Sequence, residues 1–225
     1  TWAACAGANA HGLAVTTDGA LFTWGIGTEG RLGHGNTTKQ SHPVQVGSLT
    51  DWAIPVALVG ASGCLKTDGT IWMWGEASAG KTGHGNTTKY SSPVQVGSAT
   101  NWIAFNAAIT GAHCMAINDS DELYAWGEGA GGTVLGGKLG VGDVSNRSNP
   151  TQVSGGGAWA AVECNNKSTM AVKTDGTLWG WGDGLLGQTA HGNTTEYSSP
   201  VQVGSLTDWT SVGGGGNGFA FGLKA

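Results

Sequence analysis

One stretch of the chain matches the phosphate-binding pattern G-x-x-x-x-G-K-[ST] letter for letter: GEASAGKT, at 75–82. Such a loop holds phosphates because a helix follows it, so that backbone N–H groups and the helix N-terminus face the anion. Here GHGN follows at 83–86, which cannot begin a helix, and the related stretches GIGTEGRL (25–32) and GDGLLGQT (182–189) lack the pattern. We therefore interpret the match as variation between related segments and predict no nucleotide site.

A glycine-rich segment, EGAGGTVLGGKLG at 128–140, is a second candidate. Gly127, Gly129 and Gly132 satisfy the dinucleotide pattern G-x-G-x-x-G, but no helix follows and no βαβ unit surrounds them. The segment is nevertheless where one copy of a repeated unit departs most from the others, and loops on a rigid scaffold often carry binding residues. The candidate binding residues in it are Glu128, Thr133, Val134, Leu135 and Lys138.

Histidines and cysteines recur along the chain and raise the question of a metal site. His34, His84 and His191 occupy one position in three copies of the repeat, whereas metal ligands must lie within about 2 Å of a shared ion. We interpret them as loop histidines and predict no metal site. The four cysteines, at 5, 64, 114 and 164, stand where other copies carry apolar residues, so we expect buried free thiols.

Composition and motif content exclude several classes of function. The chain has ten Lys and Arg against 15 Asp and Glu, a net charge of −5, so we expect no nucleic-acid partner. No apolar run approaches the roughly 20 residues of a membrane span. Neither a nucleophile elbow nor a His-Glu-x-x-His motif occurs, and the acids stand mostly at turns. We therefore expect neither an enzyme nor a cofactor.

All of these residues lie in a tandem repeat. HGNTTKQSHPVQVGSLTDW at 34–52 recurs at 84–102 and 191–209 with few changes, and in diverged form at 141–159. The closing tryptophan of this segment sets a period of about 50 residues. The chain, a single domain over 1–225, thus divides into repeats at 2–51, 52–101, 102–158 and 159–208 and a partial repeat at 209–225.

Each repeat predicts four strands. LAVTTDGALFTW (13–24) and its copies are two apolar runs joined by Asp-Gly, which is typical of a hairpin with a two-residue primed turn. The third repeat has DSDE at 119–122, where we expect a longer loop. PVQV at 43–46 predicts an edge strand that begins at its proline, and the first seven or so residues of the repeat supply the fourth strand. Four short strands per repeat favour an all-β propeller blade.

The pattern resembles the regulator of chromosome condensation repeat. The resemblance rests on Trp-Gly, then GRLGHG at 30–35, then Ser-x-Pro-Val-Gln-Val, then Trp, then Ala-Val-x-Thr-Asp-Gly, and it covers essentially the whole chain. It implies a β-propeller of four-stranded antiparallel blades, commonly about seven of them. Because the chain has four repeats and part of a fifth, and Thr1 and Trp209 stand at nearly the same phase, we expect an incomplete ring or a segment of a larger propeller.

Aromatic residues at one repeat position leave two interpretations open. Phe22, Trp72, Tyr124 and Trp179 each precede the tryptophan of Trp-Gly by two residues. They either pack between neighbouring blades or stay exposed and bind a sugar or a partner. Trp72, Tyr124 and Trp179 are the candidate surface aromatics.

These features together predict a non-enzymatic β-propeller that serves as a scaffold or a binding module. By family analogy, the near-identical repeats and few charges favour a virion appendage, such as a tail fibre, or a secreted microbial surface protein, located outside the cell or on the virion. Its partners would be proteins or glycans at the propeller loops, other virion proteins or further copies of the chain. The alternative is a regulatory protein that binds a protein partner, as an exchange factor or an enzyme inhibitor does.

Overall fold

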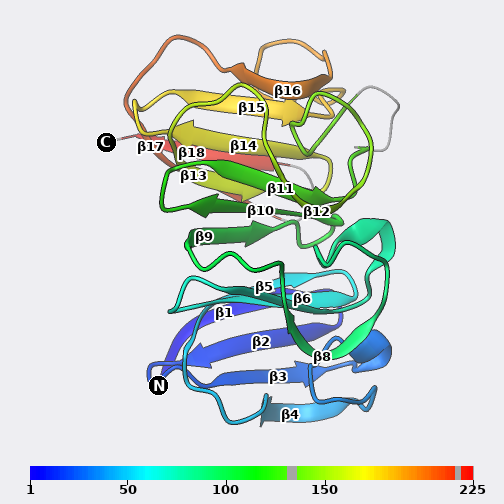
Figure 1. The fold of residues 1–225 in the computed structure, drawn as a ribbon. Coiled ribbons are helices and arrows are strands. Elements are labelled where there is room, and N and C mark those ends of the chain that lie inside the picture. The colour runs from blue at the N-terminus through cyan, green and yellow to red at the C-terminus, as the bar shows by residue number, and fades with distance from the viewer. Residues whose placement is uncertain (131–135, 216–218, 225) are drawn as a thin grey trace.

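The computed structural model describes residues 1–130, 136–215 and 219–224. They form four four-stranded antiparallel sheets and one two-stranded sheet, stacked in chain order (Figure 1). Each sheet lies within one repeat, so we call the sheets blades 1 to 5. The helical elements among the described residues are two 3₁₀ turns, η1 (Thr28–Gly30) and η2 (Ser78–Gly80). None of the described helices is long and apolar enough to cross a membrane.

The strands follow the same order in every blade, and consecutive strands pair with each other. Blade 1 holds β1 (Trp2–Ala8), β2 (His11–Thr16), β3 (Leu21–Gly25) and β4 (Gln40–Gln45); blade 2 holds β5 (Trp52–Leu58), β6 (Ala61–Lys66), β7 (Ile71–Gly75) and β8 (Tyr90–Gln95). Blade 3 holds β9 (Trp102–Ala107), β10 (His113–Asn118), β11 (Leu123–Gly127) and β12 (Arg147–Gln152); blade 4 holds β13 (Trp159–Cys164), β14 (Ser168–Lys173), β15 (Leu178–Gly182) and β16 (Tyr197–Gln202). Blade 5 holds β17 (Trp209–Gly215) and β18 (Phe219–Lys224).

The first strand of each blade contacts the first strand of the next blade. These contacts join β1 to β5, β5 to β9, β9 to β13 and β13 to β17. The first strands are therefore the inner strands of the arrangement, and the last strand of each four-stranded blade is its outer edge. The predicted all-β propeller of four-stranded antiparallel blades is confirmed.

The Asp-Gly segments form hairpins, but their turn differs from the prediction. In blade 1 the N–H of Gly19 donates to the carbonyl of Thr16 at 2.9 Å, and the N–H of Thr16 donates to the carbonyl of Ala20 at 2.9 Å. Three residues therefore connect the strands. Gly19 has a φ of +84° while Asp18 keeps a negative φ. This is a type I turn followed by a left-handed bulge residue, not a two-residue primed turn.

The turn of blade 3 has the same length as the others, so the longer loop predicted at 119–122 is wrong. The N–H of Asp121 donates to the carbonyl of Asn118 at 3.0 Å, and the N–H of Asn118 donates to the carbonyl of Glu122 at 3.1 Å. Asp121 takes a φ of +58° where the other blades have glycine. Aspartate is one of the few residues that adopt this region without severe strain, so no extra residue is needed.

The PVQV segments lie in the outer edge strands, as predicted, but these strands begin earlier than their prolines. β4 begins at Gln40, so Pro43 lies inside the strand. The register with β3 shifts between Thr23 and Gly25, because Thr23 pairs with Val44 and Gly25 pairs with Gln40. Pro43 therefore sits in a bulge of an edge strand, where its missing N–H leaves no ladder partner unsatisfied.

The hydrophobic core lies between successive blades. One buried cluster joins blades 1 and 2, and similar clusters join blades 2 and 3, blades 3 and 4, and blades 4 and 5. Trp74, Trp126 and Trp181, the tryptophans of the Trp-Gly pairs in blades 2 to 4, are 0% exposed. Burial of large aromatic side chains is the dominant stabilising contribution at such seams. Each blade therefore needs a close copy of itself beside it, which accounts for the repetition in the sequence.

Hydrogen bonds fix the rotation of each buried indole across its seam. The indole N–H donates to a backbone carbonyl in the preceding blade: Trp74 to Arg31 at 2.9 Å, Trp126 to Lys81 at 3.1 Å and Trp181 to Lys138 at 3.0 Å. Each of the three acceptor residues directly follows a glycine in the loop between the third and fourth strands of its blade. The loops between the third and fourth strands are thus tied to the next blade.

The strand order gives the propeller two faces. The β1–β2 and β3–β4 connections of every four-stranded blade lie at one end, which we call the loop face, since antiparallel strands alternate in direction. The N–H of Ile26 donates to the carbonyl of Ala10 at 2.8 Å there. The β2–β3 hairpins and the links between blades lie at the other end, the hairpin face, where the N–H of Trp52 donates to the carbonyl of Gly19 at 3.1 Å.

Candidate binding site on the inner strands

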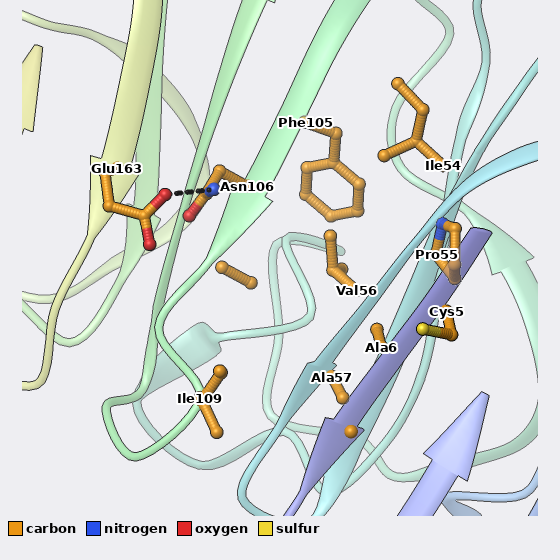
Figure 2. A pocket seen from close by; sticks show the side chains of 12 residues that line it. Cys5, Ala6, Ile54, Pro55, Val56, Ala57, Phe105, Asn106, Ile109 and Glu163 are labelled. Atoms are coloured by element: carbon orange, nitrogen blue, oxygen red, sulfur yellow. Dashed lines mark hydrogen bonds between the residues drawn. The ribbon is translucent and has the colours of Figure 1, made fainter. Parts of the chain in front are cut away.

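The inner strands of four blades line a pocket of about 260 Å³ (Figure 2). β1, β5 and β9 supply most of its wall, and β13 supplies Glu163. Hydrocarbon groups dominate the lining, among them the side chains of Ile54, Val56 and Phe105. Because these strands are held by the cores between blades, the pocket is part of the rigid scaffold.

The pocket has one polar end, formed by Asn106 and Glu163 (Figure 2). Nδ2 of Asn106 donates to Oε2 of Glu163 at 3.1 Å, and the backbone N–H of Cys164 donates to Oδ1 of Asn106 at 3.1 Å. The two bonds fix the orientation of the Asn106 amide. Burial raises the pKa of the Glu163 carboxyl, and the bond from Asn106 opposes that shift in part. Glu163 is the only charged side chain among the residues that line the pocket.

Two apolar side chains are exposed in turns of the loop face that follow inner strands. Ile109, in the turn after β9, lines the pocket and is 40% exposed. Val59, in the turn after β5, is also 40% exposed. Isolated exposed apolar residues are ordinary, but an exposed apolar side chain that lines an apolar recess marks a surface that a partner can cover.

The structure gives the predicted loop residues Glu128 and Lys138 a structural role. Nζ of Lys138 donates to Oε2 of Glu128 at 2.5 Å, and its side chain is only 2% exposed. The same ammonium reaches the carbonyl of Asn166 in blade 4 at 3.5 Å. Lys138 therefore anchors the β11–β12 loop to the next blade. Thr133, Val134 and Leu135 lie outside the described residues.

The lysine of the phosphate-loop pattern is engaged in the same way. Nζ of Lys81 donates to a carboxylate oxygen of Glu76 and to the carbonyl of Val59, the latter at 2.7 Å. The Lys81 side chain is 3% exposed, and the three residues of η2 take the place of a helix. This ammonium is buried and already has an anionic partner.

The candidate surface aromatics are half-buried. Each ring meets the first tryptophan of its own blade edge to face: Trp72 with Trp52 at 6.2 Å, Tyr124 with Trp102 at 5.2 Å and Trp179 with Trp159 at 6.1 Å between ring centroids. All three also pack against the cluster between their blade and the preceding one. Of the two interpretations left open, these contacts favour packing between blades.

A lysine ammonium lies over the rings of two of these aromatic pairs. The ammonium of Lys66 lies 4.5 Å from the ring centroids of both Trp52 and Trp72. The ammonium of Lys173 lies 4.8 Å and 4.1 Å from the corresponding rings of blade 4. Cation–π contacts of this kind place the ammonium over one face of each ring.

The repeated histidines bind the third strand of their own blade. Nε2 of His84 pairs with the carbonyl of Met73 at 3.2 Å, and Nε2 of His191 pairs with the carbonyl of Gly180 at 3.1 Å. Nε2 of His34 pairs with the hydroxyl of Thr23 at 3.0 Å. Among the described residues, no group of three or more His, Cys, Asp and Glu side chains could hold a metal ion.

The prediction of buried free thiols is confirmed at Cys64, Cys114 and Cys164, and it is wrong at Cys5, which is exposed. Cys5 differs because it faces the open pocket from β1. Burial raises the pKa of Cys64 to about 12 and that of Cys164 well above its ordinary value. These two thiols are therefore poor nucleophiles at neutral pH.

Asn106 and Glu163 were not among the site residues predicted from the sequence. Counted from the first tryptophan of each repeat, both occupy the position that holds Ala6 in blade 1 and Val56 in blade 2. Comparison of the repeats could have identified them, since they are polar residues at a position that is apolar in the first two blades. Burying a polar group costs free energy unless it is hydrogen-bonded, so such a substitution indicates a specific role.

The chain is similar to known proteins over most of its length. The profile of the regulator of chromosome condensation (RCC1) repeat matches residues 18–63. The chain is 32% identical over 203 residues to the human E3 ubiquitin-protein ligase HERC2, which covers 87% of the chain and 4% of that protein. It is 28% identical over 203 residues to the Ultraviolet-B receptor UVR8 of Arabidopsis thaliana, covering 88% of the chain and 45% of the receptor.

Solved structures share the fold at low sequence identity. The yeast RCC1 protein Prp20, in its complex with Kap60, superposes with a TM-score of 0.80 at 18% identity, over 100% of this chain and 54% of that one. Human WBSCR16 superposes with a TM-score of 0.74 at 20% identity, over 89% of this chain and 51% of that one. The chain thus spans about half the length of these structures and less than half of the two curated relatives.

Proposed function

Because this chain carries the repeats of the regulator of chromosome condensation family, we propose that it is a non-enzymatic binding module that regulates a protein partner held on its loop face. The observation that carries the proposal is the apolar pocket of the inner strands, which the exposed side chain of Ile109 lines at the loop face. Protein interfaces are anchored by a few apolar or aromatic side chains that fill such recesses on a rigid surface.

Similar proteins support a protein partner over the other candidates. Prp20 has been solved bound to Kap60, and Prp20p is described by its binding to Gsp1p and histones. HERC2 is a ubiquitin ligase and UVR8 a receptor, and none of these relatives is a virion or surface appendage. The expected virion appendage therefore gives way to the alternative, a regulatory protein with a protein partner. Glycans, virion proteins and further copies of the chain have no support among these relatives.

Binding to three probe proteins tests the proposal. Gsp1p, histones and Kap60 are each titrated against the purified chain by isothermal calorimetry, and we expect at least one to bind with a micromolar Kd. Ile109→Ser, on the loop face, should weaken that binding about tenfold, since burial of such a side chain contributes about 1.5–3 kcal/mol. Leu206→Ser is the matched control, because Leu206 is 49% exposed on the hairpin face.

The control variant should bind like the unchanged chain. Equal weakening by the two variants would place the partner elsewhere, and no binding to any of the three probes would count against the regulatory function itself.

A further inference from the structure

The geometry points to the ligand chemistry of the inner-strand pocket: we propose that it binds a primary ammonium group carried on an apolar stem, as in a lysine side chain. The arrangement that carries this is a single carboxylate, Glu163, at one end of a hydrocarbon-lined pocket of about 260 Å³. The inference rests on the proposed function only for a protein as the source of the lysine.

The charge of the pocket favours a bound cation. Glu163 makes none of the ion pairs found among the described residues. The other titratable groups beside it are the thiols of Cys5, in the same pocket, and Cys164, the next residue along β13. Withdrawing a carboxylate from water without a counterion is costly, and a bound cation removes that cost. The raised pKa of the Glu163 carboxyl agrees with burial that lacks a cationic partner.

Hydrogen bonding leaves one oxygen of Glu163 available. Oε2 accepts from Asn106, whose amide is held in place by the N–H of Cys164. Oε1 accepts no hydrogen bond from the described residues. A single free oxygen suits the point charge of an ammonium, whereas a guanidinium binds a carboxylate best through two parallel N–H bonds that need both oxygens.

The rest of the pocket suits an apolar stem. Figure 2 shows the Glu163–Asn106 pair on one side of the pocket and Ile54 and Pro55 on the other, with Phe105 and Val56 between them. Lysine lays its methylene chain along apolar surface while its ammonium reaches a polar site. Phe105 is held in place by stacking on Trp126, with 5.8 Å between ring centroids, so the wall is preformed.

Small amines test this ligand chemistry directly. n-Pentylammonium, n-pentanol and n-pentylguanidinium are titrated into the ¹⁵N-labelled chain, and the Asn106 side-chain amide and Cys164 backbone amide report the site. We expect n-pentylammonium to bind with a millimolar Kd, about tenfold tighter than the other two compounds. In Glu163→Gln, which keeps an acceptor for Asn106 but removes the charge, the preference over n-pentanol should disappear.

Glu29→Gln is the matched control, because it removes a carboxylate paired with Lys89 on an outer loop; the preference should stay unchanged there. Equal binding of n-pentylammonium and n-pentanol, or a preference that survives in Glu163→Gln, would overturn the proposal.

Competition with the protein partner separates the two sources of the ammonium group. Displacement of the bound partner by n-pentylammonium supports a lysine of that partner as the ligand, whereas simultaneous binding supports a free amine. If a partner binds but n-pentylammonium does not, the ammonium site is refuted and the proposed function stands. If n-pentylammonium binds and no partner does, the proposed function fails and the ammonium site stands.

Discussion

Replacing Gly69 by alanine should destabilise the propeller by about 2–5 kcal/mol. Gly69 has a φ of +78°, a region that costs a residue with a Cβ atom about 1–2 kcal/mol. The added Cβ would also lie 2.4 Å from the carbonyl oxygen of Thr100, in the link that leads to blade 3. Relieving that overlap means moving the link, and overpacking of this kind costs about 1–3 kcal/mol.

Asp121 provides the matched control, since it stands at the same turn position in blade 3. It already has a Cβ at a φ of +58°, and the link beside it runs through Gly155, Gly156 and Gly157, all with positive φ. Asp121→Ala should therefore change the free energy of unfolding by less than about 1 kcal/mol. Urea unfolding followed by tryptophan fluorescence measures both variants. Equal losses would refute the conclusion that contact with the link, beyond backbone conformation, requires glycine at this turn.

Three further predictions concern the seams and the aromatic pairs. Trp126→Phe removes the donor to the carbonyl of Lys81 and should lower the free energy of unfolding by about 1–3 kcal/mol in the same urea assay; an unchanged midpoint would contradict the seam bond. Burial and the charge of Arg31 lower the pKa of His11 to about 4. Because the folded protein favours the neutral imidazole, His11 contributes its full stabilisation above the unfolded pKa of about 6.5, and this stabilisation is lost as the pH falls toward 4. Between pH 7 and pH 4, the free energy of unfolding of His11→Gln should therefore fall by up to about 3 kcal/mol less than that of the unchanged chain. Equal pH dependence of the two free energies would contradict the lowered pKa of His11. Lys173→Gln should cost about 1 kcal/mol and Lys173→Arg much less, because only the arginine keeps a cation over the paired tryptophans of blade 4; thermal melts that rank the two equally would argue against the cation–π contact.

The fold was predictable from the sequence because its copies can be compared with one another. Repeated tryptophans, Asp-Gly pairs and PVQV segments mark the same strands in successive blades. The turn geometry was not predictable, since Asp-Gly is compatible with both two-residue and three-residue connections. Contact between the turn and the link to the next blade, as between Gly19 and Thr50, is a tertiary constraint that no single hairpin sequence contains.

The candidate site was less predictable, because it depends on which residues neighbouring blades cover. Lys138 looks exposed in a glycine-rich loop, yet Glu128 and a turn of blade 4 bury it. Glu163 looks like one acid in an ordinary strand, yet the inner strands of three other blades place it at the end of an apolar pocket. Comparing the polarity of equivalent positions finds this residue, whereas comparing loop lengths does not.

Hydrogen exchange of the chain with and without a bound probe protein tests most directly whether the partner sits on the loop face over the pocket. A partner on the loop face should slow amide exchange in the turns at 57–60 and 107–112 and leave the hairpins at 67–70 and 119–122 unchanged. Protection confined to those hairpins, or to the outer strands β4 and β8, would contradict it.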